Sequence, residues 1–94
     1  MNRENIICLI ESEIKNNKEP EVNLMRGVVK QGFLDLLIIS KNPKYQKWKS
    51  EAKIWFTEES EDLKFVCNLA QLNYQRIRMI YDLINTLEVS DYLL

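Results

Sequence analysis

The chain has 94 residues, enough for one domain with its own hydrophobic core, and its two glycines and two prolines are too few for a protein built from many short strands. Its net charge of −1 differs from that of a strongly basic nucleic-acid binder, and the absence of histidine excludes histidine-based catalysis and histidine-containing zinc sites. The composition favours an all-α fold, which we expect to be a single domain of about five helices arranged as an orthogonal bundle.

An amphipathic helix is predicted within residues 1–17, followed by a loop at residues 18–23 that contains Pro20. Four isoleucines recur at helical spacing and share one face of this helix: Ile6, Ile7, Ile10 and Ile14. A lone amphipathic helix in front of a loop needs a surface on which to bury such a stripe. We therefore expect these isoleucines to form the contact of a homodimer.

Residues 24–94 are expected to form the helical core, which begins with a helix over residues 24–40 that Asn23 caps. The apolar residues of this helix wrap more than half of its surface, which predicts a central and mostly buried position. Gly27 and Gly32 lie inside the helix, where a glycine costs up to about 1 kcal/mol relative to alanine. A close crossing with another helix would explain both glycines.

A third helix is predicted to begin at Pro43, which suits the first helical position, and to end near Phe56. The region is basic, because residues 26–53 carry seven lysines and arginines against two acidic residues. A tryptophan exposed on this helix would mark a protein-binding or dimer surface. The aromatic residues of its apolar face are nevertheless expected to lie in the core: Tyr45, Trp48, Trp55 and Phe56.

The chain from residue 61 to residue 87 is predicted to hold two short helices joined by a tight turn after Ala70. Alanine at this point allows the two helices to approach closely, and Asn73 is placed to cap the second helix, 74–87. The final segment, VSDYLL, is predicted to be a tail. This layout is that of a helix-turn-helix, whose second helix enters the major groove of DNA.

The same segment resembles the helix-turn-helix of the lactose-repressor family, whose pattern runs roughly V-A-x-x-A-G-V-S-x-x-T-V-S-R-V. The resemblance covers less than a fifth of the chain. Gln71 occupies the place of the turn glycine, and Arg78 and Met79 replace the family's Ser-Arg pair. Matching positions are occupied by Val66, Cys67, Ala70, Leu72, Asn73, Ile77 and Ile80.

A longer stretch, residues 24–80, is similar to a family of small helical bacteriophage and prophage proteins of uncharacterised function. Those proteins carry, in order, a V-x-x-Q-A-x-x-D helix, an A-x-x-W motif and a V-C-x-x-A-x-L-(D/N) motif. The similarity implies a phage or mobile-element origin without implying a mechanism. The residues that carry it here are Val28, Gln31, Asp35, Ala52, Trp55, Val66, Cys67, Ala70, Leu72 and Asn73.

Duplex DNA is the partner that these patterns favour, read by helix 74–87 of a dimeric, phage-type transcription regulator. Arginine and glutamine on a recognition helix make bidentate contacts to base edges, and nearby lysines add phosphate contacts that weaken with salt. The residues expected to bind DNA are Asn73, Tyr74, Gln75, Arg76, Arg78, Met79, Lys44, Lys47 and Lys49.

The alternative is a helical protein-interaction or adaptor module that does not bind nucleic acid. In that case the polar residues form an ordinary helix surface, on which Arg78 and Asp82 make an i,i+4 pair. The near-neutral net charge favours the adaptor, whereas the clustered lysines favour DNA.

Enzymatic activity is not expected, because the sequence has neither a glycine-rich phosphate loop nor a histidine base beside a nucleophile. No cofactor or metal is expected either. The longest apolar stretch, residues 33–39, is too short to span a membrane, so we expect a cytoplasmic protein without a membrane partner. Cys8 and Cys67 are expected to be reduced, buried thiols.

Overall fold

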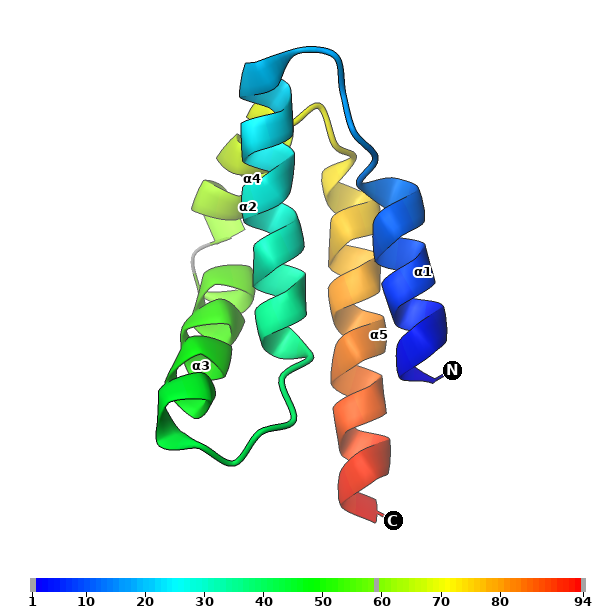
Figure 1. The fold of residues 1–94 in the computed structure, drawn as a ribbon, viewed down its shortest axis with the longest axis vertical. Helices are drawn as coiled ribbons and strands as arrows, with labels where there is room; N and C mark the ends of the chain where they lie inside the picture. Colours follow the sequence, from blue (N-terminus) through cyan, green and yellow to red (C-terminus); the bar gives the residue numbers. More distant parts are fainter. Residues whose placement is uncertain (1, 59, 94) are drawn as a thin grey trace.

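Five α-helices make up the fold in a computed structural model that describes residues 2–58 and 60–93, with the side chains of residues 60 and 88–93 outside the description. The predicted all-α fold is confirmed, since the described residues contain no strand. Figure 1 shows α1 beside α5 on one side of the molecule, α2 in the middle, and α3 and α4 on the other side. In chain order the helices are α1 (Arg3–Glu13), α2 (Pro20–Leu36), α3 (Pro43–Thr57), α4 (Ser60–Leu69) and α5 (Tyr74–Leu93).

The two ends of the chain point toward the same end of the long axis (Figure 1). The connection between α1 and α2 lies at the opposite end, beside the turn between α4 and α5. α5 runs 20 residues, so the segment predicted as a tail continues the helix to Leu93.

Asparagine side chains cap three of the helices, as short amide side chains commonly do at helix starts. The Oδ1 atoms of Asn2, Asn42 and Asn73 accept hydrogen bonds from the first-turn N–H groups of α1, α3 and α5, at 2.9, 3.0 and 3.1 Å. The predicted cap at Asn73 is therefore confirmed. α3 begins at Pro43 as predicted, because proline has no N–H to leave unpaired there.

The bounds of α2 differ from those predicted. The helix begins at Pro20, so Asn23 lies within it, where its Oδ1 accepts a hydrogen bond from the N–H of Asn17 at 2.6 Å and closes the preceding loop. α2 ends at Leu36 instead of near residue 40. Two remote cations bind the carbonyl groups just beyond this end: Arg3 donates to Leu37 O, and Lys49 donates to Ile38 O.

The isoleucine stripe of α1 is buried within the chain, which corrects the prediction that it forms a dimer contact. Ile6, Ile10 and Ile14 belong to the main hydrophobic core, and Ile7 packs against that core. α1 makes its main helix contact with α5. Apolar residues of the same molecule thus cover the stripe, so these isoleucines do not form the predicted dimer contact.

A stack of aromatic rings joins three helices at the centre of the core. The ring centroids of Phe33 (α2) and Phe56 (α3) lie 4.8 Å apart, and those of Phe56 and Tyr81 (α5) lie 5.5 Å apart. Gly32 allows this close approach, because a Cβ atom there would lie 3.1 Å from the Phe56 ring and 3.2 Å from the Trp55 ring. The predicted helix crossing is therefore confirmed at Gly32. A Cβ at Gly27 would meet nothing within 4 Å.

Candidate interaction surfaces

A tight turn joins α4 to α5 and has the hydrogen bonds of a Schellman motif. The N–H of Leu72 donates to Cys67 O at 2.9 Å, and the N–H of Gln71 donates to Asn68 O at 3.1 Å. Gln71 has a φ of 55°, the left-handed conformation that glycine usually supplies at this point. Ala70 is fully buried beneath the turn. Two helices and a turn thus occupy the predicted segment, and its use as a DNA-reading motif stays a prediction.

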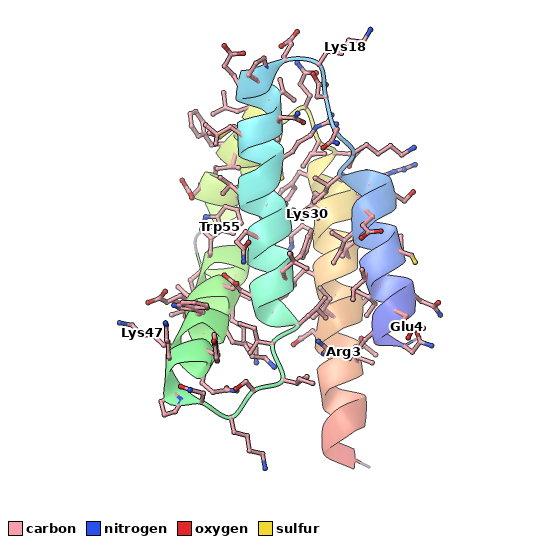
Figure 2. All side chains as sticks on the ribbon, viewed as in Figure 1. Arg3, Glu4, Lys18, Lys30, Lys47 and Trp55 are labelled. Atoms are coloured by element: carbon pink, nitrogen blue, oxygen red, sulfur yellow. The ribbon has the colours of Figure 1, made fainter. Side chains whose placement is uncertain are left out.

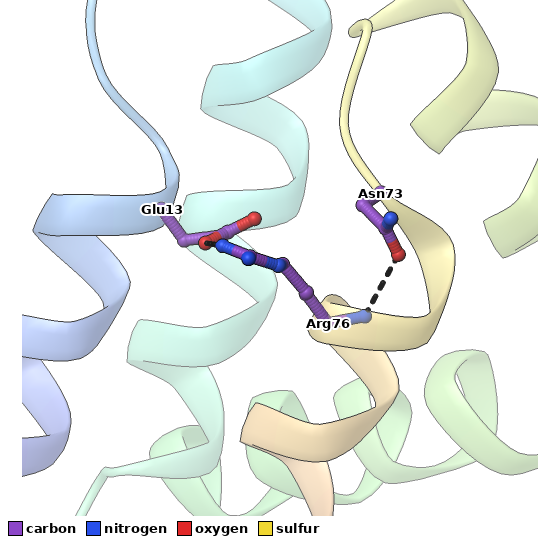
Figure 3. Close-up of polar contacts among 3 residues, drawn as sticks. All are labelled: Glu13, Asn73 and Arg76. Carbon is purple, nitrogen blue, oxygen red and sulfur yellow. Dashed lines mark hydrogen bonds and ion pairs between the residues drawn. The ribbon is translucent and has the colours of Figure 1, made fainter.

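The first turns of α5 expose some of the predicted DNA-binding residues. Gln75 and Met79 are exposed. The side chain of Arg76 is also exposed, and its guanidinium lies 3.4 Å from a carboxylate oxygen of Glu13 in α1 (Figure 3). Tyr74 is half-buried, with the Lys64 ammonium 5.4 Å from its ring centre. The accessible part of this surface is therefore small, and its one arginine already faces a carboxylate.

Arg78 points toward the body of the molecule, which corrects its predicted place on a DNA-binding surface. Its guanidinium donates a hydrogen bond to Phe56 O at the end of α3 and lies 5.2 Å from the Tyr81 ring centre. These contacts hold the charge against the protein's own main chain. Arg78 therefore has a structural role in joining α5 to α3.

The predicted phosphate-binding lysines lie away from the start of α5. Lys44, Lys47 and Lys49 are in the first half of α3, and α3 begins near the opposite end of the long axis from the start of α5 (Figure 1; Lys47 is labelled in Figure 2). The Lys49 ammonium binds Ile38 O at 3.0 Å, and that of Lys44 lies 5.4 Å from the Trp48 ring centre. The structure does not bring the lysines together with the predicted reading residues.

The aromatic face of α3 is only partly buried, which corrects the expectation that all of it lies in the core. Phe56 is fully buried, whereas Tyr45 and Trp48 are exposed and form an edge-to-face pair with ring centroids 5.2 Å apart. Trp55 is half-buried, and its indole N–H donates to a carboxylate oxygen of Asp62 at 2.5 Å. This bond holds the Trp55 ring at the edge of α3 that faces α2.

An open apolar groove of about 590 Å³ runs between α2 and α3. Two aliphatic side chains one helical turn apart border it on α2: Leu24, which is 66% exposed, and Val28, which is 42% exposed. The ring of Trp55 borders it on the α3 side, and Asp35 lies at the end nearest the C-terminus of α2. Gly27, Gln31, Gly32 and Ala52 complete most of the lining.

A second, smaller hollow of about 230 Å³ lies on the other flank of α2 and is basic. Figure 2 shows Lys30 and Trp55, one from each hollow, on opposite sides of α2. Asn23 and Gly27 line both hollows, so the two meet at this point of the helix. The remaining residues of the basic hollow are Ile14, Lys15, Asn16, Arg26 and Lys30.

Arg26 connects three segments at the floor of this basic hollow. Its Nε donates to Ala70 O at 2.8 Å and one terminal nitrogen to Gln71 O at 3.4 Å, both in the α4–α5 turn. The other terminal nitrogen donates to Lys15 O at 2.7 Å, in the α1–α2 connection. All three acceptors are main-chain carbonyl groups, so these bonds hold the guanidinium in place without supplying a formal negative charge.

Sequence reasoning missed these two hollows of α2, although two signals in the sequence point to the apolar one. The apolar residues of α2 cover more of the helix than its buried face needs: Val29, Phe33 and Leu36 are buried, whereas Leu24 and Val28 are not. Gly27 is a second signal, because it weakens the helix and no contact among the described residues requires it. From the sequence alone, the wide apolar face predicts a buried helix, and Gly27 predicts a close helix crossing.

Comparison with known proteins leaves the function to be argued from these surfaces: no protein-family model, no curated protein and no solved structure matches the chain. Among the described residues, no helix is both long and apolar enough to cross a membrane. The same residues contain no cluster of three or more cysteines and carboxylates suited to holding a metal ion. Cys67 is buried, whereas Cys8 is exposed, which corrects the expectation that both thiols are buried.

Proposed function

We propose that the protein is a small helical adaptor that binds an amphipathic helix of a partner protein in the groove between α2 and α3. The observation that carries this proposal is the exposure of Leu24 and Val28 along an apolar groove walled by Trp55. Isolated apolar side chains are normal on a protein surface, whereas adjoining ones beside a hollow are typical of interaction sites.

The length of the groove suits a helix. From Leu24 to Asp35, α2 presents about three turns, or roughly 16 Å. Side chains at positions i, i+4 and i+7 of a bound helix span roughly 10 Å, so all three fit within this length. The Trp55 ring is held by Asp62 and by the packing of Phe56, so the wall of the groove is formed before binding. A wall formed in advance lowers the entropy cost of binding.

An NMR titration tests the proposal with a defined probe. The probe is a synthetic, staple-stabilised helical peptide with leucines at positions i, i+4 and i+7 and glutamines elsewhere on its exposed faces. When it is added to ¹⁵N-labelled protein, we expect amide shifts to concentrate in residues 24–35 of α2 and around Trp55.

Two matched variants complete this test. Leu24→Ser should weaken binding about tenfold, since an apolar anchor that loses its contact area costs on the order of 1–2 kcal/mol. Phe65→Ser removes an equally exposed apolar side chain from α4 and should leave binding unchanged. Shifts scattered over the molecule, or equal effects of both substitutions, would show that the groove is not the site.

Binding of duplex DNA through helix 74–87 is the second candidate function. Gln75, Arg76 and Met79 are exposed at the start of α5, where a reading helix needs such residues. Asp82 is exposed farther along the same helix, and the carboxylate of Glu13 lies beside Arg76; both would repel phosphate groups. The adaptor is therefore the better supported proposal.

Fluorescence anisotropy with a labelled generic duplex tests this second candidate. If DNA is the ligand, binding at micromolar protein should be measurable at about 50 mM salt and should weaken steeply as salt rises. Loss of sequence preference in Gln75→Ala/Arg76→Ala would locate the reading surface on α5. Loss of binding in Lys44→Ala/Lys47→Ala would locate it on α3. No binding at that salt concentration would make the DNA hypothesis wrong.

A further inference from the structure

The apolar groove and the basic hollow share Asn23 and Gly27, so one bound segment would contact both. Lys15, Arg26 and Lys30 place three positive charges around the basic hollow, and none of the described residues that line it carries a carboxylate. Among the described residues, the guanidinium of Arg26 donates its hydrogen bonds to main-chain carbonyl oxygens, which carry no formal charge to neutralise it. Like charges gathered around a partly enclosed hollow attract an anion.

Gly27 is the place where a second backbone would approach α2 most closely. Glycine within a helix weakens it relative to alanine, so its presence there is a cost that a packing contact or a bound partner can offset. At Gly32 the reason for the glycine is packing, because a Cβ atom there would press against the rings of Phe56 and Trp55. Gly27 has no neighbour within 4 Å of where its Cβ would be, so no contact among the described residues accounts for it.

We infer that the partner helix is acidic at one end and crosses α2 at Gly27. Its apolar side chains then cover Leu24, Val28 and Trp55, and its aspartate or glutamate side chains reach Lys15 and Lys30. The far end of the groove carries Asp35, which repels carboxylates and so fixes which end of the partner is acidic. The inference rests on the adaptor function and adds the chemistry and orientation of the partner.

Two peptides that differ only in charge test this inference. Both carry the same leucine anchors, and the positions at one end are glutamate in the first peptide and glutamine in the second. Their dissociation constants are measured by NMR titration of the 94-residue chain. At about 50 mM salt the acidic peptide should bind about tenfold more tightly, and this preference should shrink at high salt, where exposed charges are screened.

Paired lysine substitutions locate the source of that preference. Lys15→Gln/Lys30→Gln should abolish the preference for the acidic peptide and leave the affinity for the glutamine peptide unchanged. Lys44→Gln/Lys47→Gln removes the same charge from exposed positions on α3 and should leave the preference intact. Arg26 is not used for this test, because it also holds two connections of the fold.

Gly27→Ala tests the crossing point itself. The added methyl group occupies space that is open in the free protein, so both peptides should bind at least tenfold more weakly while the urea midpoint of unfolding rises. Unchanged peptide affinity in this variant would overturn the crossing at Gly27.

The remaining outcomes separate the inference from the adaptor function. Equal binding of the two peptides would overturn the inference and leave the adaptor standing. Binding of neither peptide would overturn both. A preference lost equally in the Lys44/Lys47 control would show attraction by overall charge and would overturn the inference. A dimer detected by light scattering that Gly27→Ala dissociates would mean that a second copy fills the groove, which would also overturn it.

Discussion

At the scale of single residues, Gln71 holds a backbone conformation that costs an L-amino acid about 1 kcal/mol or more. We expect Gln71→Gly to raise the free energy of unfolding by about 0.5–1 kcal/mol, because relief of this strain exceeds the extra entropy of glycine in the unfolded chain. Urea denaturation measures the change. Gln75→Gly, within α5, is the matched control and should lower stability by a similar amount.

Gly27 and Gly32 should respond in opposite directions to the same substitution. Gly27→Ala should raise the free energy of unfolding by about 0.5–1 kcal/mol, since the new Cβ meets nothing and alanine favours the helix. Gly32→Ala should lower it by about 1–3 kcal/mol, because the buried Phe56 ring has no space to move away. If both substitutions changed the free energy of unfolding in the same direction, the close contact between α2 and α3 at Gly32 would be contradicted.

Burial of Cys67 raises the pKa of its thiol from 9.0 to about 11. The folded state therefore keeps a proton that the unfolded state loses, and this contribution to stability is lost as the pH rises from about 9 to about 11. Urea midpoints measured across this range should fall more steeply for the wild type than for Cys67→Ala. At neutral pH a disulfide reagent should modify the exposed Cys8 quickly and Cys67 only on unfolding.

At the scale of helices and connections, Arg26 binds both the α1–α2 connection and the α4–α5 turn. Arg26→Met keeps the apolar stem and removes the donors, and should lower the free energy of unfolding by about 1–2 kcal/mol, given the partial exposure of these bonds. Arg76→Met removes an exposed ion pair and should change stability by less than about 0.5 kcal/mol. If both substitutions lowered the free energy of unfolding equally in urea denaturation, the hydrogen bonds of Arg26 would contribute no more to stability than the exposed ion pair of Arg76.

Local signals in the sequence predict that these helices exist. They do not predict which other helix each one packs against. Asn73 and Pro43 mark helix starts because capping depends on residues within one turn. The spacing of Ile6, Ile10 and Ile14 shows that one face is buried, without showing what covers it. Likewise, the carbonyl groups beyond the end of α2 bind Arg3 and Lys49, and Arg78 binds Phe56 O. Each of these pairs is remote in the sequence.

At the scale of the whole molecule, the stack of Phe33, Phe56 and Tyr81 ties α2, α3 and α5 into one core. We therefore expect a single cooperative unfolding transition. Tryptophan fluorescence reports on α3, which holds both tryptophans, and far-UV circular dichroism reports on all helices. The two urea curves should coincide. An earlier fluorescence transition would show that α3 separates before the rest unfolds.

The sequence alone could not establish the candidate site, because the groove depends on how the helices pack against one another. A wide apolar face on α2 is compatible with complete burial or with a second contact surface, and only the position of α3 decides between them. The distribution of charge also depends on the fold. The lysines and arginines of residues 26–53 form one basic block in the sequence, whereas Lys30 and Lys47 lie on different faces of the molecule (Figure 2).

The position of the chain ends has a practical consequence. The first turn of α1 and the last turn of α5 both lie away from the α1–α2 connection (Figure 1), which holds Lys15 of the basic hollow. A fusion partner or affinity tag attached at either terminus therefore stays clear of this end. Tethering the protein to a sensor chip through its C-terminus would present the basic hollow to the flowing analyte, with no internal attachment point required.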